Sequence, residues 1–173
     1  MKNKITETDK DTKLSNQQKK VAEKMGFSYE EYAQLIKKVE KVVQIDLPLE
    51  VYYSKKKKFI LNLNNYRNAH YRVLSASKKL YSEQLVERIK DYPRFTEPVK
   101  LVFTYYARSN RRLDISNPCS IIDKFTCDAL VKAEIIEDDS FEQIKEVVYK
   151  FGGVDKDNPR CILELFPSSK KNI

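Results

Sequence analysis

Residues 111–141 constrain this chain more than any other segment, because they combine many acids with a few well-spaced bases. The acids are Asp114, Asp123, Asp128, Glu137, Asp138 and Asp139; Arg111 and Arg112 precede them, and Lys124 lies among them. In a chain of net charge +8, carboxylates gathered around a lysine indicate a hard divalent metal ion that acts on a phosphate. The alternative is a solvated acidic turn at 137–139 and a surface ion pair between Lys124 and Asp128.

The segments on either side predict an α/β (α+β) fold with a small mixed sheet. Residues 99–107 are β-branched and aromatic, which favours a strand. A helix is expected over 118–133, with Asn117 as its N-cap and Pro118 at its first position. Its apolar positions are Ile121, Ile122, Phe125 and Ala129, while Asp123 and Lys124 lie on its other side.

The remaining periodic segments complete the expected sheet and its helical layer. A second helix, capped by Ser75 and ending near Lys90, would bury Tyr81, Leu85, Val86 and Ile89. Further strands are expected at 57–63, 143–150 and 160–166, the last two as a closing pair joined by a loop with Gly152 and Gly153. We therefore expect about four strands with two helices packed on them.

The chain before residue 47 predicts a helical extension. Residues 1–15 are polar and are expected to form a disordered tail. Residues 16–46 predict a helical hairpin whose first helix ends at Gly26 and whose second begins with a capping box of Ser28 and Glu31. The second helix has an apolar stripe of Tyr32, Leu35, Ile36, Val39 and Val43. Residues 46–50 are interpreted as a linker into a main domain at 47–167, and residues 168–173 as a polar tail.

Positive charge concentrated in one segment predicts nucleic acid as the partner. Residues 51–82 contain no acid and eight bases, which are Lys55, Lys56, Lys57, Lys58, Arg67, Arg72, Lys78 and Lys79. Subtracting these eight from 33 bases leaves 25, which equals the 25 acids, so this segment carries the whole excess. Such a field favours a polyanion, with nucleic acid ahead of an anionic membrane surface. The alternative is a solvated lysine face.

Residues 64–72 are interpreted as a loop that contacts DNA. Amides, aromatic rings and arginines of this kind bond phosphates and stack on bases. The alternative is a loop held in place by its own amides.

Several functional classes are disfavoured by residues that are scarce. Glycine occurs only at 26, 152 and 153, so the sequence has no glycine-rich phosphate loop or dinucleotide fingerprint. His70 is the single histidine, and Cys119, Cys127 and Cys161 lack zinc spacing. An odd cysteine count favours reduced thiols in a cytoplasmic protein. No apolar run is long enough to span a membrane, so no membrane partner is expected. With glycine, histidine and cysteine sites disfavoured, carboxylate chemistry remains, and no small-molecule cofactor is expected.

From about residue 59 to 166 an ordered set of residues resembles the RusA family of Holliday-junction resolvases, particularly its phage-borne members. The matching positions are Asn64, Asn65, Tyr66, Tyr81, Arg111, Arg112, Asp114, Asn117, Lys124, residues 128–130 and residues 136–140. The resemblance implies a homodimer that cuts four-way DNA junctions with Mg²⁺ or Mn²⁺. It places the family's metal-binding aspartates on Asp114 and Asp139 and its required lysine on Lys124.

The chain departs from the family pattern at three places. Ser116 stands where the family usually has a second aspartate, and about four additional residues separate Asn117 from Lys124. Four residues are close to one helical turn, so Lys124 can keep its facing. Asp123 or Asp128 would then replace the missing carboxylate, with Asp138 as a further ligand. Glu134 stands where the family commonly has a helix-ending glycine, so the helix is expected to end differently.

We therefore expect a metal-dependent endonuclease that resolves branched DNA in recombination, repair or phage DNA processing. Its expected catalytic residues are Asp114, Asp123, Lys124, Asp128 and Asp139, and Asp138 joins the four aspartates as a metal ligand. Its expected DNA contacts are Lys55, Lys56, Lys57, Lys58, Asn64, Asn65, Arg67, His70, Arg72, Arg111 and Arg112. The alternatives are a catalytically impaired branched-DNA-binding protein and a nuclease for other structures, such as flaps or RNA.

Overall fold

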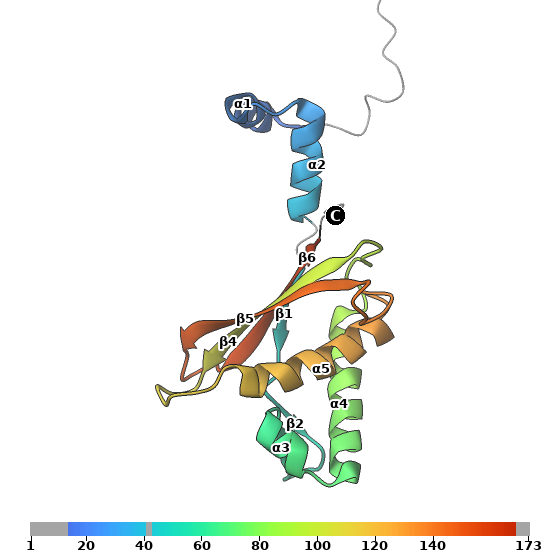
Figure 1. Ribbon diagram of the computed structural model, residues 1–173, viewed down its shortest axis with the longest axis vertical. Coiled ribbons are helices and arrows are strands. Elements are labelled where there is room, and N and C mark those ends of the chain that lie inside the picture. Colours follow the sequence, from blue (N-terminus) through green and yellow to red (C-terminus); the bar gives the residue numbers. More distant parts are fainter. Residues whose placement is uncertain (1–13, 41–42, 169–173) are drawn as a thin grey trace, which may run out of the picture. The chain divides into compact units, whose positions relative to one another are not determined.

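A computed structural model of the chain describes residues 14–40 and 43–168, with the backbone alone for residues 35–40. The chain divides into two compact units, Met1–Lys41 and Val42–Ile173 (Figure 1). Within the described ranges, no helix is both long and apolar enough to cross a membrane. The fold is mixed α+β, as the sequence predicts.

The first unit contains α1 (Asn16–Met25) and α2 (Tyr29–Glu40). Ser15 and Gln18 form a capping box at the start of α1, and Gly26 ends it in the left-handed conformation, with φ of 74°. The expected capping box of α2 is confirmed, because Ser28 N donates to Glu31 at 2.9 Å and Glu31 N donates to Ser28 Oγ at 3.2 Å. Of the expected apolar stripe, Leu35, Ile36 and Val39 lie outside the described side chains.

The second unit is built on a four-stranded mixed sheet. Its strands are β1 (Val43–Leu47), β4 (Val99–Ala107), β5 (Ile144–Val154) and β6 (Arg160–Pro167), in the order β1-β6-β4-β5. β6 pairs antiparallel with both β1 and β4, whereas β5 pairs parallel with β4. The expected closing pair is therefore wrong, since β4 lies between β5 and β6. Gly152 and Gly153, expected in a loop, belong to β5.

β1 corrects the expected boundary between extension and main domain. Val43, assigned to the helical stripe, begins this strand, and Asp46, assigned to a linker, lies within it. The strand alternates buried and exposed positions, with Val43, Ile45 and Leu47 turned into the core. Buried and exposed positions alternate over only five residues, which is too short to predict a strand after a helical pattern. The strand is identified only by its pairing with β6.

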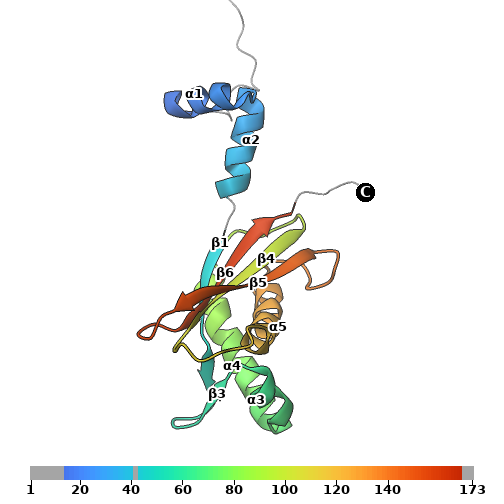
Figure 2. The same ribbon diagram turned by 60° about the vertical axis from the view of Figure 1, so that its left-hand side comes forward.

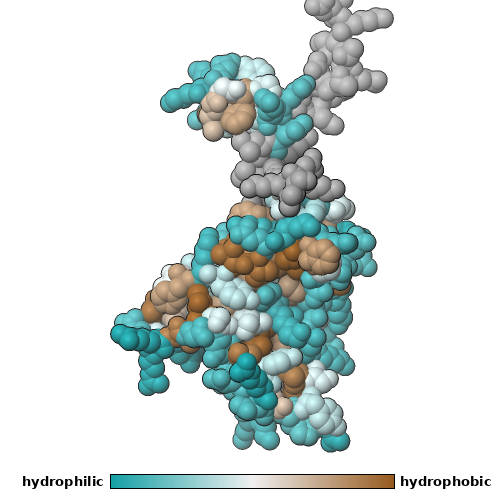
Figure 3. All heavy atoms as spheres, viewed as in Figure 1, coloured by the Kyte–Doolittle hydropathy of each residue, from teal (hydrophilic) through white to brown (hydrophobic). Residues whose placement is uncertain are grey.

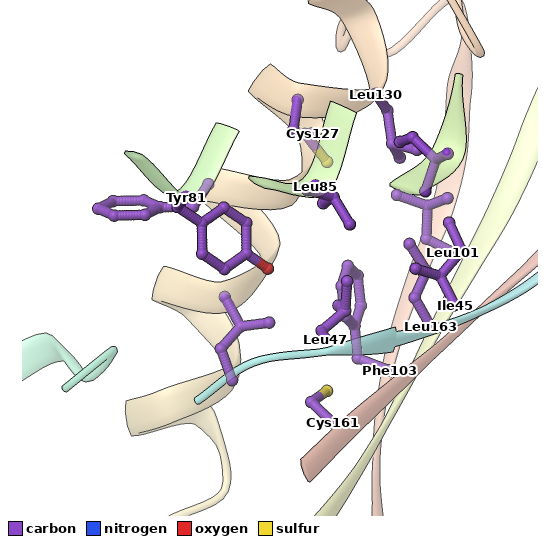
Figure 4. Packing of buried hydrophobic residues seen from close by; sticks show 14 of the residues in the cluster. Ile45, Leu47, Tyr81, Leu85, Leu101, Phe103, Cys127, Leu130, Cys161 and Leu163 are labelled. Atoms are coloured by element: carbon purple, nitrogen blue, oxygen red, sulfur yellow. The ribbon is translucent and has the colours of Figure 1, made fainter. Parts of the chain in front are cut away.

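Two helices cover one face of the sheet (Figures 1 and 2). They are α4 (Tyr71–Ile89) and α5 (Ser116–Lys132), and α5 is the crossover that a parallel β4–β5 pair requires. The buried positions expected on α5 are confirmed, namely Ile121, Ile122, Phe125 and Ala129. The expected N-cap is wrong, because α5 begins at Ser116 and the Asn117 side chain accepts from Leu63 N instead. Figure 4 shows strand residues such as Leu101, Phe103 and Leu163 meeting the helix residues Leu85 and Leu130 in one core.

The segment before α4 differs most from the expected structure. A two-stranded ribbon of β2 (Glu50–Tyr52) and β3 (Lys58–Ile60) leads into α3 (Leu63–Asn68). The expected strand at 57–63 is thus shorter, and the expected loop at 64–72 is wrong. α4 begins at Tyr71 with His70 as its N-cap, so Ser75 lies inside the helix. The side-chain oxygen of Asn62 caps α3 by accepting a hydrogen bond from Asn65 N, so a neighbouring amide holds the start of this helix.

Candidate active site

An open pocket of about 450 Å³ lies where α5 meets the segment that leads into β5. Ser120, Asp123, Lys124 and Cys127 line it from α5; Asp139 and Phe141 line it from the preceding turn, and Ile144 and Val147 from β5. The helix residues recur at three- and four-residue spacing, so they share one face of α5. The pocket thus unites three of the expected catalytic residues, Asp123, Lys124 and Asp139.

Asp123 is held in place from two sides. Its Oδ2 accepts a hydrogen bond from Tyr149 Oη at 2.8 Å, and its Oδ1 accepts one from Cys127 Sγ at 3.1 Å. These two hydrogen bonds restrict the orientation of the carboxylate. Tyr149 lies on β5 opposite Phe103 of β4, and the two rings form a T-shaped pair with centroids 5.9 Å apart. The sheet therefore positions the carboxylate that α5 carries.

Negative charge accumulates around Cys127. Burial, followed by the charge and hydrogen bond of Asp123 and the charges of Asp139 and Asp128, raises the pKa of the Cys127 thiol. Burial and the nearby Asp123 likewise raise the pKa of Tyr149. Both groups therefore remain protonated donors at neutral pH. The charges of Asp123 and Asp139 thus both act on the Cys127 thiol.

Asp128 faces away from this pocket toward α4. Its Oδ2 lies 2.5 Å from Lys78 Nζ in an ion pair that joins the two helices. The alternative pairing of Lys124 with Asp128 is therefore wrong. Of the two acids considered as replacements for the carboxylate missing at Ser116, the pocket contains Asp123 and not Asp128.

Asp114 also lies outside the pocket lining. Its Oδ1 accepts from Ser116 N at 3.0 Å and from Ser116 Oγ at 2.7 Å, so this carboxylate is engaged at the start of α5. The parallel pairing explains the separation from Asp139: Val99 is opposite Ile144 and Ala107 is opposite Val154. The segment that carries Asp139 enters the sheet where β4 begins, whereas the segment that carries Asp114 leaves where β4 ends.

The donor set suits a hard cation held by few protein ligands. In the described part of the chain, no three Asp, Glu, His or Cys side chains form a group that could hold a metal ion. Asp138 is exposed and does not line the pocket. Mg²⁺, however, often binds through one or two carboxylates plus substrate phosphates, while keeping several waters. Asp123 and Asp139 fit that arrangement.

The basic residues expected to contact DNA lie on three exposed segments. Lys55, Lys56 and Lys57 are exposed in the turn between β2 and β3, and Arg111 and Arg112 are exposed before α5. Three of the eight bases at 51–82 pair with acids: Lys58 with Glu50, Lys78 with Asp128 and Lys79 with Glu83. The local excess of charge is therefore carried by the other five.

A corner between α3 and α4 carries the third segment. Arg67, His70 and Arg72 are exposed there, and the ring of Tyr71 lies 4.6 Å from that of His70. Arg72 Nε donates to Tyr71 Oη at 3.0 Å. Asn65 has a structural role instead, because its Nδ2 donates to the backbone oxygen of Ile60. Asn64 lines a second pocket together with Leu113 and Asn117, which places this corner near the start of α5.

The residues at the pocket that were not expected from the sequence include Tyr149, Ser120 and Phe141. Tyr149 carried no local signal, because its role depends on a contact with Asp123 from another element. Ser120 lies one turn before Lys124 on α5 and follows from helical spacing once that helix is accepted. Phe141 lies two residues after Asp139, and its 79% exposure is visible only in the structure.

No protein-family model matches this sequence, and no curated protein matches it either.

Proposed function

We propose that this protein is a Mg²⁺- or Mn²⁺-dependent endonuclease that cuts branched DNA by phosphodiester hydrolysis. The observation that carries the proposal is the pocket in which Asp123, Lys124 and Asp139 meet. Two carboxylates and an ammonium group in an open pocket suit a metal-assisted reaction at a phosphate. The ordered resemblance to the RusA family supports the same reaction and adds four-way junctions as the substrate.

Each pocket residue has a distinct task in this reaction. Asp123 and Asp139 would hold the cation, which when bound activates water and neutralises charge at the phosphate. Tyr149 and Cys127 keep Asp123 oriented through their hydrogen bonds. Lys124 is exposed and forms no ion pair among residues 14–40 and 43–168, so its ammonium can approach a substrate phosphate.

Basic residues near the start of α5 support DNA as the polymer. Asn117 Oδ1 accepts from Leu63 N at 3.0 Å, which ties the start of α3 to the first turn of α5. Ser120 of the pocket lies three residues after Asn117, about one helical turn along α5. Arg67, Arg72, Arg111 and Arg112 would contact phosphates flanking the cleaved one. A homodimer would match the two-fold symmetry of a four-way junction.

A second candidate function is branched-DNA binding without cleavage. Ser116 and the position of Asp114 favour it, because the pocket holds two carboxylates where the resemblance implies a larger set. Such a protein would bind junctions equally well with and without Mg²⁺.

Cleavage of a labelled synthetic four-way junction tests the proposal, with linear duplex and flap DNA as controls and Mg²⁺, Mn²⁺ or EDTA in parallel. We expect paired, metal-dependent nicks confined to the junction. Asp123→Asn and Asp139→Asn should each reduce the cleavage rate by about 100-fold or more, as loss of a transition-state charge contact does. Asp138→Asn, which changes the acid next to Asp139 outside the pocket, is the matched control and should retain the parent rate.

A binding measurement separates the two functions. Calorimetry can measure Mn²⁺ binding to the parent and to the variants Asp123→Asn and Asp139→Asn. We expect each variant to lack one metal site that the parent has. Tight junction binding by the parent with no cutting under either metal would replace the nuclease proposal with the binding function, and Ser116→Asp is then the substitution that should restore cleavage.

A further inference from the structure

The pocket has two chemically different walls. Asp123, Lys124 and Asp139 form a charged wall, whereas Phe141, Ile144 and Val147 form an apolar one. Figure 3 shows this contrast on a larger scale, with apolar surface over the strands of the second unit bordered by hydrophilic surface. A ligand that fills the pocket must therefore offer charge to one wall and an apolar face to the other.

Phe141 is the most exposed large apolar residue of the described ranges, with 79% of its surface accessible. Phe141 precedes β5 in the chain, and the ammonium of Lys145 lies 6.0 Å from its ring centroid. A positive charge over an aromatic face stabilises the ring in place. An aromatic face that is open to solvent and bordered by positive charge suits stacking with a nucleobase, as in single-strand binding sites.

Pocket size agrees with a single nucleotide. The volume of about 450 Å³ falls within the range of sites that enclose small ligands. A nucleotide carries its phosphate and its base at opposite ends, so the phosphate can face the charged wall while the base faces the apolar wall. Duplex DNA keeps its bases stacked inside, so only an unpaired or extruded nucleotide can present its base to this wall.

We propose that the pocket accepts one unstacked nucleotide whose base stacks on Phe141 while its phosphate meets Lys124 and the cation that Asp123 and Asp139 would hold. The inference rests on the proposed nuclease function and specifies its substrate: DNA with an unpaired or unstacked base next to the cleaved phosphate, as at a branch point. Phe141 is then a specificity-determining residue, and the chemistry belongs to the charged wall.

Junction binding by variants at Phe141 tests this inference. In EDTA, where no cleavage occurs, Phe141→Ala should raise the Kd for the four-way junction by about 5-fold to 100-fold, as loss of a base–aromatic stack does. Phe141→Trp should keep the parent Kd, and Phe141→Leu should resemble Phe141→Ala. Phe151→Ala is the control, because Phe151 is 59% exposed on β5 but does not line the pocket.

Removing the base from the DNA identifies the contact. Abasic sites are placed in turn at each nucleotide around the mapped cleavage position. At one position the abasic site should weaken binding by the parent as much as Phe141→Ala does, and the two changes together should weaken it no further. Effects that multiply at every position, or an unchanged Kd for Phe141→Ala, would overturn the stacking role.

The failure of this inference is distinguishable from failure of the proposed function. A parent protein that cuts junctions while Phe141→Ala binds and cuts them equally well overturns only the nucleotide contact. A parent protein that neither binds nor cuts branched DNA overturns both. A change in the sedimentation coefficient of Phe141→Ala, with weaker binding that is independent of abasic position, would assign Phe141 to contact between copies of the chain instead.

Discussion

Glu134 ends α5 in the left-handed backbone conformation, with φ of 58°. Residues other than glycine rarely adopt this conformation. Glu134 N donates to Val131 O and Ile135 N donates to Leu130 O, both at 3.0 Å, which completes a Schellman motif. The expectation that this helix ends differently without glycine is therefore wrong. Burial of Ile135, which is 1% exposed, holds the turn in place despite the strain.

Glu134→Gly should stabilise the protein, because glycine adopts positive φ without a steric penalty. We expect the free energy of unfolding to rise by about 0.5–1 kcal/mol after the entropic cost of glycine is included. Lys132→Gly, within the last turn of α5, is the control and should lower it by a similar amount. Urea unfolding followed by circular dichroism measures both, and a decrease for both variants would contradict the account.

At the scale of elements, β5 is an edge strand that accommodates a ring from its neighbour. A Cβ on Gly152 would lie 2.6 Å from Tyr106 Cζ and 2.8 Å from Thr104 Cγ2. The guanidinium of Arg160 lies 4.2 Å from the centroid of the Tyr106 ring. A glycine in this strand therefore leaves space for an aromatic ring that joins β4 to β6.

Gly152→Ala should displace the Tyr106 ring and weaken its contact with Arg160. We expect a loss of about 1–3 kcal/mol in the free energy of unfolding, as for other overpacked sites. Combining it with Tyr106→Ala removes the clash with the ring and leaves only the one with Thr104 Cγ2, so the double variant should be more stable than the sum of the two single effects predicts. Additive effects in urea unfolding would show that the ring does not occupy this space.

At the scale of the whole molecule, the core of the second unit depends on its first strand, β1. The second unit contains a core that includes residues from β1, β4, β6, α4 and α5. Val43, Ile45 and Leu47 of β1 are 8%, 3% and 1% exposed. The core therefore depends on a strand that lies directly after the first unit in the chain.

A chain that begins at Val42 should fold, whereas one that begins at Pro48 should not. The shorter chain loses the burial of three β1 side chains, about 1.5–3 kcal/mol each, which is comparable to the whole stability of a typical domain. Thermal unfolding followed by near-ultraviolet circular dichroism should show a cooperative transition only for the longer chain. Cooperative unfolding of both would mean that β1 contributes little.

Local patterns were sufficient for many elements. Caps and apolar spacing predicted α1, the start of α2 and the buried face of α5, and β-branched and aromatic residues predicted β4 within its observed bounds. These features depend on hydrogen bonds and spacing within a few residues, so the sequence displays them directly. The expected catalytic residues also included the three that line the pocket, Asp123, Lys124 and Asp139.

Only the tertiary structure decided which distant residues meet. The parallel pairing of β4 and β5 keeps Asp114 out of the pocket that contains Asp139, and Lys78 of α4 draws Asp128 toward another helix. Tyr149 meets Asp123 only through a contact between elements, and Phe141 lines the pocket only because its segment lies beside α5. The sequence by itself determined the helix caps, the strongly periodic helices, strand β4 and the supply of charged groups. Strand direction and helix packing selected among them, because contacts between distant segments leave no periodic trace in the chain.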